Sequence, residues 1–143
     1  MIVTTQTGPG NGVNAKALND EAQRRYMQGI ASKNYEAVAA LYAQRPIYLP
    51  VTGGILEDRE SIRLHYAQSG MTALDVRSVR LEKMSDTVLF DTGTFTATLS
   101  EEAGGGTFEG EYVAVSEVKE NGLEIRSLTA FPKRQPSEAS AGE

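Results

Sequence analysis

The sequence predicts an α+β fold, cone-shaped, in which three N-terminal helices pack on a curved, mostly antiparallel β-sheet. Two observations lead to this prediction. Up to Gly70, apolar residues recur at the period of amphipathic helices. After Gly70, apolar and polar residues alternate, β-branched residues are enriched and turn-forming residues recur at regular intervals, which is typical of consecutive strands. Helices in one half and strands in the other favour a sheet that curves around a helix and leaves one end of the cone open.

The first two helices are predicted from their capping residues. Asn14 is the expected N-cap of the first helix, whose periodicity places Tyr26 on the packed side. Asn34 is the expected N-cap of the second helix. This helix is expected to end in residues 41–43, because the residue before Pro46 is biased toward extended backbone.

A short strand and a third helix complete the first half. Pro46 and Pro50 are expected to limit the strand to three residues, since proline lacks the N–H that a strand ladder needs. The third helix is expected at residues 59–68, with Gly70 as its C-terminal stop.

Four strands are expected in the second half, joined as an antiparallel meander. The pair Asn121-Gly122 is the most specific connection, because a type I′ turn needs positive φ at both central residues. The expected strands are residues 74–84, 87–100, 107–119 and 123–131.

The length of 143 residues and the hydrophobic content of 40% fit one compact domain. We expect this domain at residues 14–131. Residues 1–13 and 132–143 are polar and lack periodic apolar positions, so we expect a flexible N-terminal arm and a disordered tail.

Charge and composition exclude several classes of function. With 14 basic and 19 acidic residues the net charge is −5, which opposes binding to nucleic acid or to an anionic membrane. The chain has no cysteine and one histidine, so we expect no metal site and no cofactor. No apolar run approaches the roughly 18 residues of a membrane span, and we expect a cytoplasmic protein.

A carboxylate lies on the apolar face of the strand expected at residues 87–100. Alternation places Asp91 on the same face as Leu89, Phe95 and Ala97. Burying a carboxylate in a core is costly unless hydrogen bonds or a charged partner stabilise it. Its position on this face therefore favours a functional role. Asp91 is therefore our main candidate for a catalytic acid or base. The alternatives are a structural carboxylate, hydrogen-bonded to a tyrosine or an arginine near the end of the strand, and a β-bulge that reverses which face the residue lies on.

Several short segments of the first half follow one another in the order helix, helix, strand, turn, helix. They are Tyr26, Leu41-Tyr42-Ala43, Tyr48-Leu49-Pro50, Ile62-Arg63, Tyr66-Ala67 and Ser69. This order resembles the front half of the nuclear transport factor two-like superfamily, and within it the SnoaL-like and ketosteroid isomerase-like proteins. The resemblance implies a single SnoaL-like domain with a ligand pocket in its cone. It also implies a homodimer through the outer face of the sheet, where the same strand carries a row of threonines.

The resemblance to ketosteroid isomerase covers only part of that enzyme's machinery. Tyr26 falls where ketosteroid isomerase carries the tyrosine that donates a hydrogen bond to the substrate oxyanion, which implies a catalytic role for Tyr26. The enzyme also needs an aspartate base and a protonated aspartic acid. The corresponding positions hold Leu49 and Pro50 and, for the second acid, the region of Ala114. Double-bond migration by that mechanism is therefore not expected.

His65 and four aromatic residues complete the candidate site. His65 could transfer protons if it faces the pocket, because the unperturbed pKa of histidine is about 6.5; a packed or surface histidine is the alternative. Tyr48, Tyr66, Phe95 and Tyr112 are expected to contact the ligand. Their alternative is core or dimer packing, and large residues such as Phe95 could fill the cone completely.

Two functions fit these observations. The first is a small-molecule enzyme of the SnoaL-like type, which performs a cofactor-free isomerisation, cyclisation or dehydration of a mostly apolar metabolite. Its acid–base pair would be Asp91 with Tyr26 or His65. The second is a non-catalytic ligand-binding or assembly domain with the same cone. The missing aspartates of ketosteroid isomerase favour the second function, whereas Asp91 and the tyrosines favour the first.

Overall fold

The computed structural model of the protein describes residues 12–133. The helices and strands of this part, with one 3-10 turn labelled η2, are α1 (Gly12–Ala31), α2 (Tyr35–Ala39), β1 (Tyr42–Leu49), α3 (Arg59–Ser69), β2 (Met71–Lys83), β3 (Val88–Leu99), η2 (Glu101–Ala103), β4 (Thr107–Lys119) and β5 (Gly122–Pro132). The predicted α+β class is confirmed.

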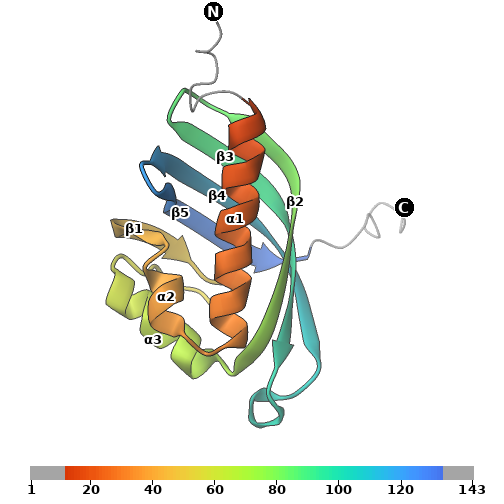
Figure 1. The fold of residues 1–143 in the computed structure, drawn as a ribbon. Helices are drawn as coiled ribbons and strands as arrows, with labels where there is room; N and C mark the ends of the chain where they lie inside the picture. The colour runs from red at the N-terminus through yellow and green to blue at the C-terminus, as the bar shows by residue number, and fades with distance from the viewer. Residues whose placement is uncertain (1–11, 134–143) are drawn as a thin grey trace, which may run out of the picture.

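The described strands form one five-stranded sheet in the order β1-β5-β4-β3-β2. Strands β2 to β5 are the predicted antiparallel meander, while β1 pairs with β5 in parallel, so the sheet is mixed. The sheet curls around α1, and α2 and α3 lie at one end of that helix (Figure 1). The inner face of the sheet and α1 therefore enclose the space in which a site can form.

The expectation of three N-terminal helices is not confirmed. One long helix, α1, is followed by the single-turn α2, and α3 comes only after β1. Because α1 begins at Gly12, Asn14 lies inside it and is not its N-cap. Asn34 does cap α2, since its side chain accepts a hydrogen bond from the Ala37 N–H at 3.2 Å. Gly70 ends α3 in the left-handed conformation, as predicted, with φ of 77°.

Strand β1 is longer than the three residues predicted and includes residues 42 and 43, which were expected in a helix. It lies at the edge of the sheet, where proline is tolerated because one side of the strand has no ladder to complete. Its pairing with β5 shifts register between Tyr42 and Ile47, so Pro46 sits within an irregular part of the ladder. Tyr42 is fully buried, which supports the strand from its start.

The turn between β4 and β5 also differs from the prediction. The two strands close at the pair Lys119 and Gly122, so the turn residues are Glu120 and Asn121 rather than Asn121 and Gly122. Among these residues Gly122 alone has positive φ, at 131°. The turn is therefore not type I′. The single glycine supplies the unusual backbone that the hairpin needs.

The predicted ends of the domain are partly outside the described residues. Of the expected arm, residues 1–11 are not described, and residues 12 and 13 belong to α1. Of the expected tail, residues 134–143 are not described. Pro132 ends β5, and the Lys133 N–H donates a hydrogen bond to the Glu109 carbonyl at 3.2 Å. None of the described helices is long and apolar enough to cross a membrane.

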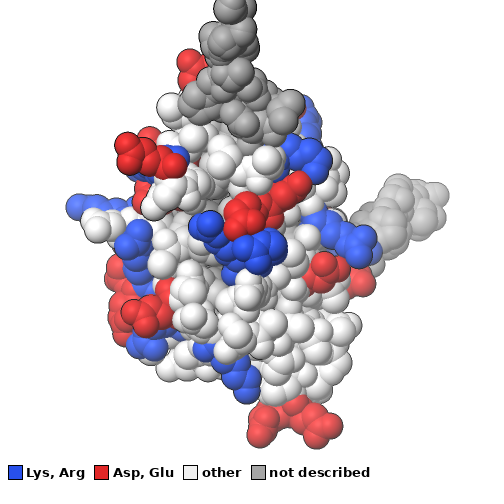
Figure 2. Space-filling view, in the orientation of Figure 1, with Lys and Arg blue, Asp and Glu red and all other residues white. Residues whose placement is uncertain are grey.

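Charged side chains of both signs are interspersed on the face of the molecule that Figure 2 shows. Along the outer side of α1 they form ion pairs one turn apart. Lys16 pairs with Asp20 at 2.7 Å, and Glu21 pairs with Arg24 and Arg25 at 2.8 Å. The exposed side of α1 is thus solvated and its opposite side is left for packing against the sheet.

Candidate functional site

A cavity of about 350 Å³ lies between α1 and α3 and the inner face of the sheet. Its volume falls within the roughly 300–1,000 Å³ of small-molecule sites. Most of its wall is apolar, and none of the lysines and arginines in residues 12–133 lines it. The cavity wall includes all of the residues predicted for the site, namely Tyr26, Tyr48, His65, Tyr66, Asp91, Phe95 and Tyr112.

Asp91 is placed on the cavity wall by the alternation of β3. It is 5% exposed, and its neighbours on the same face, Leu89 and Ala97, are also buried, which confirms the predicted inward face. In the register of the sheet Asp91 lies opposite Ala114, so the side chain of Tyr112 is its diagonal neighbour on β4. Gly93 lies directly opposite Tyr112, and the absence of a side chain there leaves room for the Tyr112 hydroxyl, which a Cβ atom would approach to 2.9 Å.

The Asp91 carboxylate accepts three hydrogen bonds from described residues. The Tyr112 hydroxyl donates to Oδ2 at 2.6 Å, and Gln23 Nε2 donates to the same oxygen at 3.1 Å. The Ser78 hydroxyl donates to Oδ1. Gln23 comes from α1, Ser78 from β2 and Tyr112 from β4, so three elements hold the carboxylate. Among the described residues no cation pairs with it.

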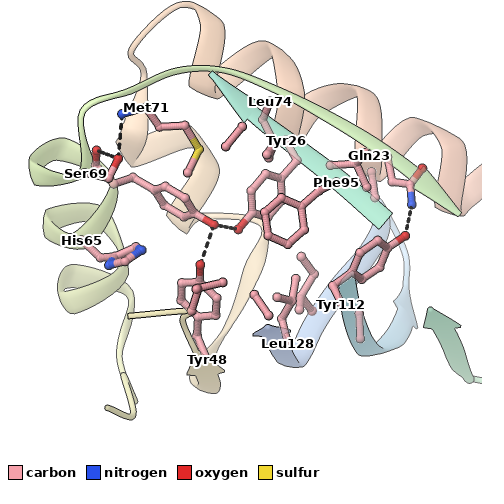
Figure 3. A pocket seen from close by; sticks show the side chains of 18 of the residues that line it. Gln23, Tyr26, Tyr48, His65, Ser69, Met71, Leu74, Phe95, Tyr112 and Leu128 are labelled. Carbon is pink, nitrogen blue, oxygen red and sulfur yellow. Dashed lines mark hydrogen bonds between the residues drawn. The ribbon is translucent and has the colours of Figure 1, made fainter. Parts of the chain in front are cut away.

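Tyr112 remains a donor to Asp91. Burial, together with the hydrogen bond to Asp91, raises the pKa of the Tyr112 hydroxyl above its usual value. Tyr112 also accepts a hydrogen bond from Gln23 Nε2 at 2.9 Å (Figure 3). The phenol and the amide therefore form a fixed pair beside the carboxylate.

Four buried tyrosines form a second polar cluster, which we call the tyrosine network: Tyr26 from α1, Tyr42 and Tyr48 from β1, and Tyr66 from α3. The Tyr26 hydroxyl is bonded to that of Tyr42 at 2.6 Å and to that of Tyr66. The Tyr66 hydroxyl donates to that of Tyr48 at 3.1 Å (Figure 3). Burial raises the pKa of each of these hydroxyls well above its usual value, so all four keep their protons.

Asp91 is not hydrogen-bonded to Tyr26 or to His65, its two predicted partners, although all three residues line the same cavity. Asp91 is bonded to Tyr112 and not to Tyr26, whose hydroxyl is held between two other tyrosines. His65 contacts the rings of Tyr48 and Tyr66 at centroid distances of 5.4 and 5.0 Å. Figure 3 shows His65 near Tyr48, at the opposite end of the view from Gln23 and Tyr112. Burial lowers the pKa of His65, which favours the neutral imidazole.

Phe95 lines the cavity without filling it. Its ring lies 6.1 Å from that of Phe108, and both rings belong to the wall. The alternative that large aromatic residues close the cone is therefore wrong for the described residues, because a cavity remains beside these rings.

The sequence did not single out several polar residues of the site, among them Asn19, Gln23 and Ser78. Asn19 and Gln23 lie one turn apart on the face of α1 that also carries Tyr26, and polar side chains on a packed helix face could have been noticed. Asn19 is 6% exposed, and its Nδ2 has no hydrogen-bond partner among the described residues. Ser78 left no signal, because its contact with Asp91 depends on how β2 pairs with β3.

Comparison with known proteins gives relatives by structure only. No protein-family model matches the chain, and no curated protein matches its sequence. Many solved structures are similar to it in fold. A domain of unknown function with a cystatin-like fold from Nostoc punctiforme has a TM-score of 0.75 and 13% identity, with 92% of this chain and 85% of that chain covered.

Two other structures carry more specific names. A type 2 hexachlorocyclohexane dehydrochlorinase (LinA) has a TM-score of 0.70 and 12% identity over 85% of this chain and 87% of the enzyme. A nuclear transport factor 2-like superfamily protein from Salmonella enterica has a TM-score of 0.69 and 12% identity over 88% of this chain and 96% of that protein. Such identities establish similarity of fold. The chain therefore has the nuclear transport factor 2-like fold that its sequence resembles.

Proposed function

We propose that this domain binds a small, neutral, mainly apolar molecule in its cavity and that Asp91 moves a proton on that molecule without a cofactor. The observation that carries the proposal is the position of Asp91, a buried carboxylate on the wall of an apolar cavity where no cation of the described residues pairs with it. Burying such a group is costly, so its retention there favours a chemical role.

The lining of the cavity defines the class of ligand. Apolar side chains make up most of the wall, and within the described part of the chain no lysine or arginine lines it to neutralise a phosphate or a carboxylate. An anionic ligand would also be repelled by Asp91. A neutral molecule with a large apolar surface fits these conditions.

The proposed step is a proton transfer by the Asp91 carboxylate. The carboxylate removes a proton from a carbon of the ligand. The electron pair of the broken C–H bond forms a new C=C bond while another electron pair of the ligand is displaced, either a carbonyl π pair onto its oxygen or the bonding pair of a leaving group. If Asp91 returns the proton to another carbon, the net reaction is an isomerisation. If a leaving group departs with its electron pair, the reaction is an elimination. The dehydrochlorinase of the same fold is, by its name, an enzyme of elimination.

Binding without catalysis is the second candidate function, and the hydrogen bonds of the site favour it in one respect. The Asp91 carboxylate already accepts bonds from Gln23, Ser78 and Tyr112. A carboxylate held in this way can also serve to position α1 on the sheet. In that case the cavity holds a ligand and leaves it unchanged.

Filling the cavity tests the proposed binding site. Ala114 lines the cavity from β4, and Ala114→Leu places three more carbon atoms inside it. We expect this variant to weaken binding of tetralin, a small bicyclic hydrocarbon, by roughly tenfold or more, which corresponds to about 1.4 kcal/mol. Isothermal titration measures the affinity.

The matched control is Val113→Leu, the neighbouring residue on the opposite face of β4, which does not line the cavity. It is expected to bind tetralin like the wild type. Equal affinity of all three proteins would place the binding outside this cavity and contradict the proposal.

We also propose a homodimer through the outer face of the sheet. The outward threonines of β3, of which Thr94 and Thr96 lie near the middle of the strand, suit a semi-exposed surface that a second sheet can cover. Sedimentation velocity is expected to give twice the mass of the chain. Thr94→Lys together with Thr96→Lys should shift the equilibrium to monomers, because burying the new charges in the proposed interface is costly. A monomeric wild type at tens of micromolar would contradict the dimer.

A further inference from the structure

The four hydroxyls of the tyrosine network carry one more proton than the hydrogen bonds among them require. Within the described residues its four hydroxyls are joined by three hydrogen bonds, in the order Tyr42, Tyr26, Tyr66, Tyr48. Each hydroxyl has one proton to donate and each bond uses one. One of the four protons therefore points out of the network, and the question is which tyrosine carries it.

The geometry of one bond fixes the direction of the others. Between Tyr66 and Tyr48 the hydroxyl of Tyr66 is the donor. Tyr66 has then used its proton, so its bond with Tyr26 must be donated by Tyr26. Tyr26 has in turn used its own proton, so its bond with Tyr42 must be donated by Tyr42. Donation runs from Tyr42 through Tyr26 and Tyr66 to Tyr48.

The unused proton belongs to Tyr48, and Tyr48 lines the cavity, whereas Tyr42 at the other end of the network does not. No described residue accepts a hydrogen bond from the Tyr48 hydroxyl. The nearby imidazole of His65 meets the Tyr48 ring nearly at right angles, at a centroid distance of 5.4 Å. A buried hydroxyl is stabilised when it donates a hydrogen bond, and a ligand in the cavity can supply the acceptor.

We infer that Tyr48 is the specificity-determining donor of the site and that the ligand presents to it an acceptor oxygen, such as the carbonyl of a ketone or a lactone. This inference rests on the proposed function, since it names the class of molecule that the same cavity takes. It also moves the ligand-facing hydroxyl from Tyr26, suggested by the sequence resemblance, to Tyr48. The hydroxyls that donate along the network polarise the Tyr48 hydroxyl. This polarisation strengthens the hydrogen bond that Tyr48 donates to an oxygen acceptor.

A matched pair of probes tests the inference. 2-Tetralone and tetralin share one bicyclic skeleton, and the first carries a carbonyl oxygen. The measured quantity is the ratio of their affinities, because the ratio cancels general effects of a substitution on the cavity. In Tyr48→Phe the preference for 2-tetralone is expected to fall by roughly three- to tenfold.

Tyr42→Phe is the control, since it removes a hydroxyl from the same network but outside the cavity. It is expected to keep the preference within about twofold of the wild type. Infrared spectroscopy gives a second readout. The carbonyl stretch of bound 2-tetralone should lie at lower wavenumber in the wild type and in Tyr42→Phe than in Tyr48→Phe, because a hydrogen bond to the oxygen weakens the C=O bond.

Each outcome of the test is decisive. An unchanged affinity ratio and carbonyl stretch in Tyr48→Phe would overturn the inference and leave the proposed function intact. Failure of the wild type to bind either probe would count against the cavity site itself. If Tyr48→Phe does not fold, site-specific 3-fluorotyrosine at position 48, a stronger acid, should lower the carbonyl stretch further than the same replacement at position 42. An equal effect at both positions would contradict the inference.

Discussion

Asp91→Asn is expected to slow the exchange of carbon-bound hydrogen on a cavity ligand by about 100- to 10,000-fold, the usual contribution of a general base. The substitution keeps the shape of the side chain and removes its ability to take a proton. The probe is 2-tetralone in heavy water, since the hydrogens beside its carbonyl exchange for deuterium when a base removes them. Nuclear magnetic resonance follows the loss of their signals with and without protein.

The control for this prediction is Asp75→Asn, which removes an exposed carboxylate on β2 that pairs with Arg77 at 3.2 Å. It should accelerate exchange as the wild type does. If Asp91→Asn still binds 2-tetralone and exchanges its hydrogens at the wild-type rate, Asp91 has a structural role. The non-catalytic binding domain would then be the better account.

Gly93→Ala is expected to cost about 3 kcal/mol of the free energy of unfolding, the upper end of what overpacking usually costs. A Cβ atom at Gly93 would lie 2.0 Å from the carbonyl oxygen of Arg77 and 2.9 Å from the Tyr112 hydroxyl. The Arg77 carbonyl oxygen belongs to the backbone of β2, so it cannot move away by a side-chain rotation. The pairing of β2 with β3 shifts register just beyond this point, between Ser78 and Arg80. Urea unfolding measures the loss.

Thr94→Ala is the control, because it removes side-chain atoms from the next residue of β3 on the outer face and adds none to the inner one. We expect it to change stability by less than about 1 kcal/mol. A loss of that small size in Gly93→Ala would show that β2 can move away from β3 and that the glycine is not required for close approach.

Much of the sheet could be predicted because its signals are local. Alternation along β3 placed Asp91 on the buried face, and the period-two pattern located the strand Thr107–Lys119 with the bounds that the structure has. Strand β1 was misjudged because its stability comes from parallel pairing with β5, at the far end of the chain. The two prolines that were expected to limit the strand give no information about such a distant partner strand.

The chemistry of the site was less accessible to prediction than the lining of the cavity. The partners of Asp91 come from α1, β2 and β4, and Gln23 is separated from it by 68 residues. The tyrosine network likewise joins α1, β1 and α3. Residue type and periodicity can place each side chain on an inner face, but only the packed fold decides which hydroxyl meets which.

Native mass spectrometry of the gently purified protein, with wild type and Ala114→Leu measured side by side, tests most directly whether the cavity holds a small neutral molecule. We predict a discrete added mass on the wild type after exposure to a cell extract, absent from Ala114→Leu, and removable by gentle collisional activation. The same added mass on both proteins, or none on either, would contradict the account.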